Sequence, residues 1–136
     1  MASVADTGFI LALGNADDHF HHACNAIKRQ EQIIYIPQSV LAEVGYMLNR
    51  DIGSQGLARF LRTLSETKYR VVPLELRDIL RTADLLEKYA DTRPDFVDLS
   101  IVAVAERMLI RRILTIDRRD FQIIRPAHID HFELLP

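Results

Sequence analysis

The sequence predicts an α/β fold, a three-layer sandwich in which helices flank a central, mostly parallel sheet. Short apolar runs rich in β-branched residues alternate with longer segments whose apolar residues recur at helical spacing. No Gly/Ser linker, internal repeat or low-complexity block interrupts this alternation. Strands that are separated by helices pair in parallel through crossovers. A length of 136 residues suits one domain, residues 1–136, that is large enough to bury a core.

The first elements follow from local pattern. Residues 3–5 form a short strand, and residues 7–13 begin a helix that breaks around Gly14-Asn15. A second helix covers residues 21–30. The β-branched run 33–36 (IIYI), closed by a proline, is typical of a buried strand.

The middle of the chain is mainly helical. Residues 39–50 form a helix whose end is marked by Gly53, and residues 55–66 carry leucines and a phenylalanine at helical spacing. The run 69–74 (YRVVPL) is the next strand. Residues 77–89 then repeat apolar side chains with a helical period.

The last third supplies a further helix and strand. A loop, 90–94, leads into a helix over residues 95–108, and the apolar run 113–116 (ILTI) is the fourth strand. Residues 123–124 and 132–135 supply short closing elements.

Composition excludes several classes. A formal charge of −2 offers no overall basic field, so any nucleic-acid role must come from a local arrangement. The single Cys24 excludes an internal disulfide, and its helical segment favours a small buried side chain over a nucleophile. No apolar run approaches the roughly 20 residues of a membrane span. Asp6 comes too early for a signal peptide. We therefore expect a soluble cytoplasmic protein with no membrane association.

Four acids fall at one edge of the predicted sheet. Asp6 directly follows the first strand and Asp117 the fourth, which places both at the carboxyl edge, where open α/β folds bind ligands. Glu43 comes one turn into the helix after the second strand and borders its apolar stripe. Asp98 lies in the first turn of a crossover helix, which also begins at that edge.

Each acid alone has another interpretation. Asp98, three residues after Asp95, fits helix capping. Asp6 and Asp117 fit ordinary loop acids, and Glu43 an amphipathic helix boundary. The joint placement favours a site, because independent surface acids have no reason to gather at one edge.

Clustered carboxylates repel one another, so this patch needs cations or raised pKa values. An all-oxygen donor set suits Mg²⁺ or Mn²⁺, and such sites favour hydrolysis of phosphodiesters. Arg118 and Arg119 are candidates to guide phosphates, whereas Arg93 is less well placed. Solvated loop charge remains an equal interpretation of the arginines.

Four motifs in order resemble a known family. VADTGF (4–9), PQSVLAEV (37–44), DFVDLSIVAVAE (95–106) and ILTIDRRDF (113–121) are similar to the PIN domain, specifically to VapC-type toxins of bacterial toxin–antitoxin pairs. The similarity runs essentially end to end. It implies a metal-dependent endoribonuclease acting on RNA, with a parallel sheet flanked by helices.

The resemblance also assigns roles. It implies a homodimer that is held inactive by a small VapB-type antitoxin, whose basic side chain enters the acidic pocket. Gly8 stands where the family often has Ser or Asn, which removes one polar contact near the metal. The implied acidic quartet is Asp6, Glu43, Asp98 and Asp117, with small hydroxyls at Thr7, Thr115 and, as a weaker match, Ser39, and with Asp120 as a peripheral acid or a turn residue.

Other interpretations stay open. His19, His21 and His22 lie among acids, but zinc spacing with a second distant pair is missing, so surface and helix-start roles are favoured. One rival is an aspartyl-phosphate phosphotransfer domain with Asp6 as nucleophile, although residues 104–136 lack the lysine it needs. The other is a catalytically silent binding or scaffold module.

Overall fold

A computed structural model of the chain describes residues 1–66 and 68–136. Its five strands form one sheet in the order β3-β2-β1-β4-β5, and every pairing is parallel. The predicted α/β class with a parallel sheet is therefore confirmed. The strands are β1 (Ala2–Ala5), β2 (Ile33–Pro37), β3 (Tyr69–Val72), β4 (Arg112–Leu114) and β5 (Glu133–Leu135).

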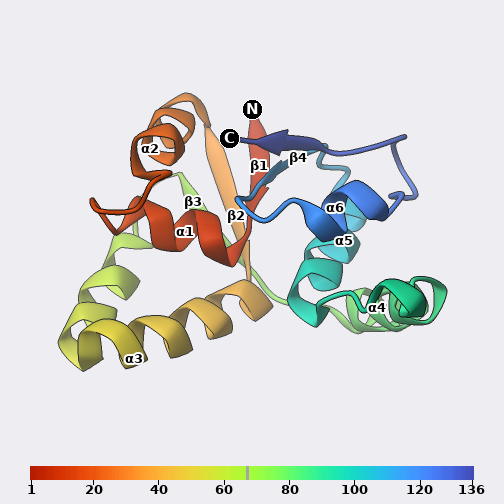
Figure 1. Ribbon diagram of the computed structural model, residues 1–136, viewed down its shortest axis with the longest axis horizontal. Coiled ribbons are helices and arrows are strands. Elements are labelled where there is room, and N and C mark those ends of the chain that lie inside the picture. Colours follow the sequence, from red (N-terminus) through yellow and green to blue (C-terminus); the bar gives the residue numbers. More distant parts are fainter. Residues whose placement is uncertain (67) are drawn as a thin grey trace.

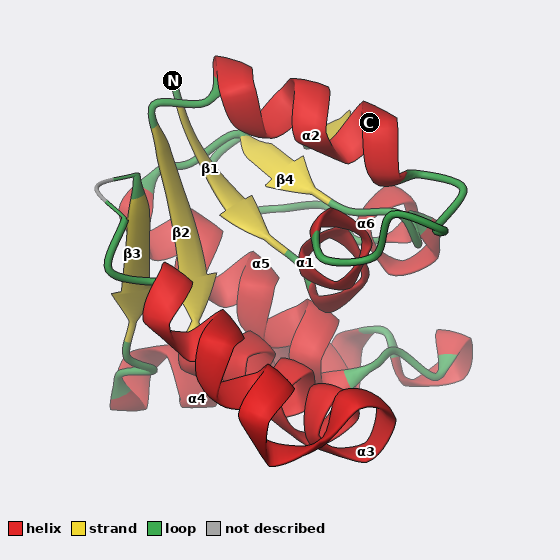
Figure 2. Cartoon of the chain, turned by 90° about the vertical axis from the view of Figure 1, so that its left-hand side faces the viewer, coloured by secondary structure: helices red, strands yellow, loops and turns green. Residues whose placement is uncertain are grey.

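Helices cover both faces of this sheet, which makes three layers (Figure 1). Helices α1, α2 and α3 lie on one side, and α4, α5 and α6 on the other. The strand arrows of β1, β2 and β3 point toward α3 (Figure 2). The helices are α1 (Thr7–Leu13), α2 (His21–Gln30), α3 (Gln38–Thr63), α4 (Leu76–Lys88), α5 (Phe96–Met108) and α6 (Arg119–Ile123), with a 3₁₀ turn η1 (Ala90–Thr92).

The core lies between the central strands and α5. Val4 and Ala5 of β1 are fully buried, because β1 is paired on both edges and covered on both faces. Residues 99–105 of α5 are all buried, so this part of the helix has no solvent-facing polar side. Central strands of parallel sheets show the same continuous apolar character. Among the described residues, no helix is long and apolar enough to cross a membrane.

Helix boundaries follow local chemistry. The predicted break at Gly53 is confirmed as a kink within α3, where φ is 77° and ψ is 178°. A residue with a Cβ adopts this positive φ only at a cost, which explains the glycine. Asp95 caps α5, since its side chain accepts a hydrogen bond from the amide of Asp98. At α4, Glu75 and Asp78 form a reciprocal capping box.

The end of the chain differs from the prediction. The strand predicted over 113–116 ends at Leu114, so Asp117 lies three residues beyond it and does not follow it directly. Thr115 turns the chain, because its hydroxyl lies 2.9 Å from the backbone oxygen of Asp117. Ile123, expected in a closing element, is the last residue of the short helix α6.

Candidate active site

Asp6 is held rigidly at the centre of the sheet edge. Its backbone amide donates to the carbonyl of Leu114 at 2.9 Å, which continues the pairing of β1 with β4. One carboxylate oxygen accepts from the amide of Thr7 at 2.6 Å, and the other accepts from the hydroxyl of Thr115 at 2.9 Å. Only 6% of Asp6 is exposed. The fold therefore fixes this carboxylate from two sides and desolvates it.

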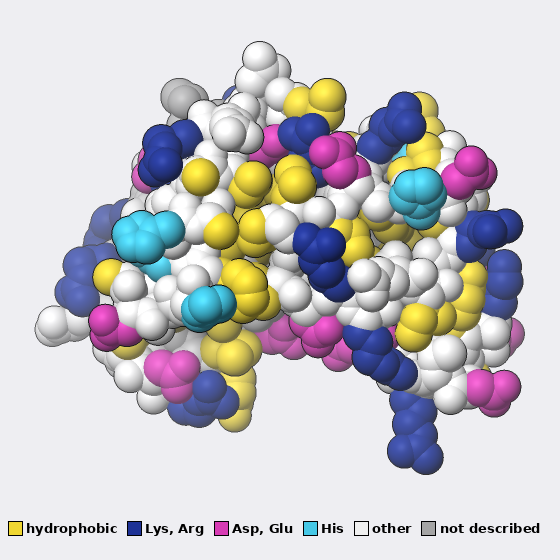
Figure 3. Space-filling view, turned by 45° about the horizontal axis from the view of Figure 1, so that its top comes forward, with side chains coloured by type: hydrophobic (Ala, Val, Ile, Leu, Met, Phe, Trp, Pro, Cys, Tyr) yellow, Lys and Arg dark blue, Asp and Glu magenta, His cyan; other side chains and the backbone are white. Residues whose placement is uncertain are grey.

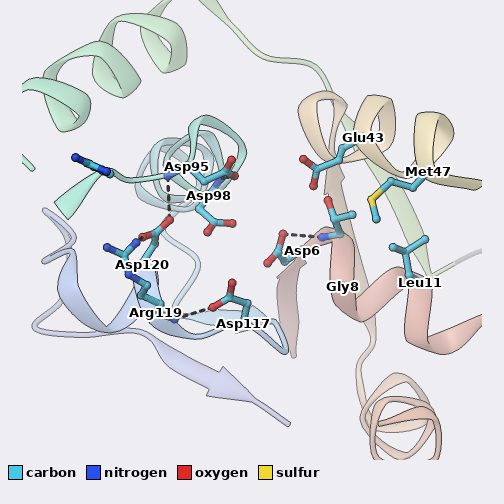
Figure 4. Close-up of a pocket in the computed structure, with 12 residues that line it drawn as sticks. Asp6, Gly8, Leu11, Glu43, Met47, Asp95, Asp98, Asp117, Arg119 and Asp120 are labelled. Atoms are coloured by element: carbon cyan, nitrogen blue, oxygen red, sulfur yellow. Dashed lines mark hydrogen bonds and ion pairs between the residues drawn. The ribbon is translucent and has the colours of Figure 1, made fainter. Parts of the chain in front are cut away.

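Asp98 enters the same edge from the opposite layer. It lies in the first turn of α5, where its amide donates to Asp95 Oδ2 at 3.1 Å. Asp120, in the first turn of α6, accepts from the amide of Asp95 at 3.0 Å. The carboxyl group of Asp120 also acts on Asp98 and raises its pKa. These contacts lock the starts of α5 and α6 together and direct Asp98 toward Asp6 (Figure 4).

Glu43 and Asp117 complete the edge from two further segments. Glu43 is half-buried in the second turn of α3, and Asp117 is exposed in the turn after β4. Asp117 Oδ1 accepts from the amide of Arg119 at 3.2 Å, which stabilises that turn. Figure 4 shows both carboxylates directed toward the space between Asp6 and Asp98.

The structure thus brings all four sequence-predicted acids into the lining of one cavity of about 400 Å³. Acidic side chains gather where the surface is recessed between the two helical layers (Figure 3). Asp95 and Asp120 add two carboxylates. The full lining is Asp6, Thr7, Gly8, Leu11, Glu43, Met47, Arg93, Asp95, Asp98, Asp117, Arg119 and Asp120.

Burial and mutual repulsion perturb two of these carboxyls. Burial, helped by the charges of Glu43 and Asp95, raises the pKa of Asp6 to about 6, although hydrogen bonds from Thr7 and Thr115 oppose the rise. Burial raises the pKa of Asp98 well above its ordinary range, and the charge of Asp6 and the carboxyl group of Asp120 act in the same direction. The acids are therefore packed more closely than their charges favour.

The donor set fits a hard divalent cation. All the carboxylates offer oxygen, and the buried hydroxyl of Thr7 meets no hydrogen-bond partner among the described residues. The part of the chain that the structure describes holds no group of three or more His, Cys, Asp or Glu side chains already arranged as a metal site. An open acidic lining suits Mg²⁺ or Mn²⁺, which retain several waters and bind few protein ligands.

The arginines are placed differently from the expectation. Arg118 donates to the carbonyls of Leu134 and Pro136 and does not line the cavity. Arg119 lines it and pairs with Asp120 at 2.9 Å, with a second contact to a loop carbonyl. Arg93, expected to be less well placed, also lines it, from a left-handed backbone with φ of 51°.

Several residues lay beyond the reach of sequence reasoning. The sequence indicated only a helix-capping role for Asp95. Asp95 lies next to the first turn of α5, which carries Asp98, and it lines the same cavity. Ser39 pairs with the hydroxyl of Ser100 at 2.6 Å and does not line the cavity. At Gly8 an added Cβ would meet only Ile116, at an ordinary 3.8 Å, so a serine would fit there.

The histidine segment is structural in part. His21 bonds through Nδ1 to the carbonyl of Ala12 at 2.8 Å, which ties the start of α2 to α1. His19 and Phe20 remain exposed beside it. No zinc-type cluster is formed by the histidines within residues 1–66 and 68–136.

Comparison with known proteins gives a family match over most of the chain. The family model described as the PIN domain matches residues 3–125. Over 134 residues, 98% of this chain and 99% of the relative, the sequence is 28% identical to Ribonuclease VapC26 of Mycobacterium tuberculosis.

Solved structures show the same fold. The crystal structure of Mycobacterium tuberculosis VapC20, described as a Sarcin-Ricin loop cleaving toxin, superposes with a TM-score of 0.81 at 23% identity, covering 93% of this chain and 98% of that one. VapBC2 from Rickettsia felis, bound to a DNA fragment from its promoter, gives a TM-score of 0.74 at 16% identity, covering 98% and 97%.

Proposed function

The chain belongs to the PIN domain family, and on that premise we propose that it is a metal-dependent endoribonuclease, the toxin of a VapBC-type toxin–antitoxin pair. One observation carries the proposal. Six carboxylates, drawn from segments far apart in the sequence, line a single cavity. Burial and their mutual repulsion raise the pKa values of Asp6 and Asp98, and a bound cation would relieve this repulsion.

Asp6, Glu43, Asp98 and Asp117 would hold Mg²⁺ or Mn²⁺. When bound, such a cation supplies an activated water and offsets negative charge on the phosphodiester and its leaving oxygen. An acidic cavity would otherwise repel an RNA backbone, so the same cation makes substrate binding feasible.

Other residues have supporting roles in the proposal. Thr115 fixes the orientation of Asp6 through its hydroxyl, and Asp120 holds the start of α5 in register. Thr7 lines the cavity, and its buried hydroxyl has no hydrogen-bond partner among the described residues. Arg93 and Arg119 supply positive charge at the rim, where phosphates would enter.

The partners come from similarity to relatives. VapC26 is named a ribonuclease, and VapBC2 and a toxin–antitoxin complex from Klebsiella pneumoniae were crystallised as pairs. We therefore expect RNA as substrate and a small VapB-type antitoxin that blocks the acidic cavity with a basic side chain. A homodimer is expected from the family resemblance alone.

Cleavage of RNA by the purified chain tests the proposal. We expect hydrolysis with Mg²⁺ or Mn²⁺, none with EDTA, and at least a hundredfold loss in Asp98→Asn, since a metal ligand is removed. Asp84→Asn, an exposed acid outside the cavity, is the matched control. Circular dichroism checks that each variant is folded.

Two outcomes would contradict the proposal. Undiminished cleavage in both Asp6→Asn and Asp98→Asn would remove the acidic cavity from the reaction. A folded chain that cuts no RNA with either metal, yet captures a specific protein, would favour the binding or scaffold module.

A further inference from the structure

A second cavity, of about 430 Å³, opens directly beside the acidic one. The two cavities share Asp6, Gly8, Leu11 and Asp117 in their linings, so they form one continuous depression. We propose that the second cavity is a nucleobase subsite, in which a base of the bound RNA stacks on Phe20 while a neighbouring phosphate occupies the acidic cavity. This inference rests on the proposed function and names how its substrate is held.

The two cavities differ in chemistry as the phosphate and the base of a nucleotide do. The acidic cavity is lined by six carboxylates and by both rim arginines, Arg93 and Arg119. The second cavity shares Asp6 and Asp117 with it and adds Asp18 as its own acid. The second cavity holds neither arginine, and its walls include Leu11, Phe20 and Ile116. A cation with a phosphate suits the first, and a flat, weakly polar ring suits the second.

Phe20 is the unusual residue of this cavity. It remains 38% exposed, although a phenylalanine is normally buried. Its ring meets His19 edge-to-face, with centroids 5.0 Å apart and an interplanar angle of 86°. Both rings of this pair line the second cavity. Bases stack on exposed aromatic faces of this kind in single-stranded RNA recognition.

The loop before α2 holds Phe20 in place. Asp18 Oδ1 accepts from the amide of Phe20 at 2.8 Å, and the amide of Asp18 donates to the carbonyl of Asn15 at 3.0 Å. The next residue, His21, bonds to the carbonyl of Ala12 at 2.8 Å. The backbone that carries Phe20 is therefore preorganised, which lowers the entropy lost on binding.

Gly8 keeps the passage between the two cavities open. It lines both, and it contributes no side chain. An added Cβ would approach Ile116 at 3.8 Å, on the side of the second cavity. A larger residue at this position would narrow the path that the sugar–phosphate chain needs to connect the two subsites.

The test uses the absence of tryptophan from the chain. Phe20→Trp keeps an aromatic face and places the only tryptophan of the variant at the proposed subsite. Combined with Asp98→Asn to prevent cleavage, it is titrated in Mg²⁺ with a short single-stranded RNA and with an abasic oligonucleotide of equal length. Binding of both is followed independently by anisotropy of a label on the RNA.

We expect the RNA, and not the abasic strand, to quench the tryptophan emission. Leu76→Trp is the control, because Leu76 is 70% exposed at the start of α4 and lines neither cavity. The tryptophan emission of this variant should stay unchanged when the RNA binds. In the otherwise unchanged chain, Phe20→Ala should raise KM about tenfold, the effect of losing one stacked base, with little change in kcat. Phe20→Tyr should restore KM.

Unchanged emission while anisotropy reports bound RNA would overturn the subsite and leave this cavity to a protein partner. Equal KM values for Phe20→Ala and the parent chain would do the same. These results differ from failure of the proposed function, in which the parent chain neither binds nor cuts any RNA.

Discussion

Replacing Asp6 by asparagine should separate stability from activity. Only 6% of Asp6 is exposed, and burial together with neighbouring acids raises the pKa of its carboxyl group from 3.8 to about 6. In the metal-free protein the folded state therefore binds this proton more tightly than the unfolded state. The protonated Asp6 carboxyl therefore contributes fully to the free energy of unfolding below about pH 4, and this contribution is lost as the pH rises toward 6.

The size of the effect follows from the two pKa values. One pKa unit corresponds to about 1.4 kcal/mol, so ionised Asp6 lowers the free energy of unfolding by about 3 kcal/mol at pH 8 relative to an unperturbed group. Asparagine carries no charge, and its side-chain oxygen can still accept from Thr7, as the carboxylate does at 2.6 Å. Asp6→Asn should therefore recover about 2 to 3 kcal/mol at pH 8 and little at pH 4.

Urea unfolding in EDTA, at pH 4 and pH 8, measures this difference. Asp17→Asn, an exposed acid outside the cavity, should leave the pH dependence of the parent chain unchanged. Equal pH dependence in Asp6→Asn and the parent chain would refute the argument that burial and repulsion strain this carboxylate. RNA cleavage by Asp6→Asn should be lost even where its stability is higher.

Three further predictions concern the scaffold and use urea unfolding at pH 7. Gly53→Ala forces a Cβ into φ of 77° and should cost about 1 kcal/mol, whereas Gly45→Ala, in open space on the same helix, should gain about 0.5 to 1 kcal/mol; equal shifts would contradict the assigned kink. Phe121→Ala removes a ring that is 2% exposed and should cost about 3 to 5 kcal/mol, and a loss under 1 kcal/mol would show that α6 is not part of the core. Arg107→Ala leaves Asp78, whose side chain is 2% exposed, without its ion pair and should cost about 3 kcal/mol; a neutral result would mean that the pair is solvated.

Most of the fold was predictable because local patterns and global topology agree. The run at 33–36 is β-branched and ends in proline, and it forms β2 as expected. The exceptions lie where side chains redirect the backbone. Thr115 and Asp117 bond within the turn after β4, which shortens the strand predicted to reach residue 116. Helix α6 has five residues, too few to show a helical period.

The cavity was predictable as an edge of the sheet and not in its detail. Asp6 and Asp98 could be placed from their positions next to a strand end and a helix start. The directions of long side chains could not: Arg118 and Arg119 are adjacent, yet only Arg119 lines the cavity. Adjacent positions in the sequence do not determine which carbonyl oxygen each arginine side chain contacts. Asp120 appeared peripheral, and its burial arises from contact with the start of α5.

The hydrogen bond from Thr115 to Asp6 joins residues 109 positions apart. During synthesis at 5 to 20 residues per second, roughly 5 to 20 seconds pass between the emergence of the two groups from the ribosome. Asp98 and Asp117 arrive in the same late interval. A growing chain therefore carries no assembled acidic cavity until most of its length exists.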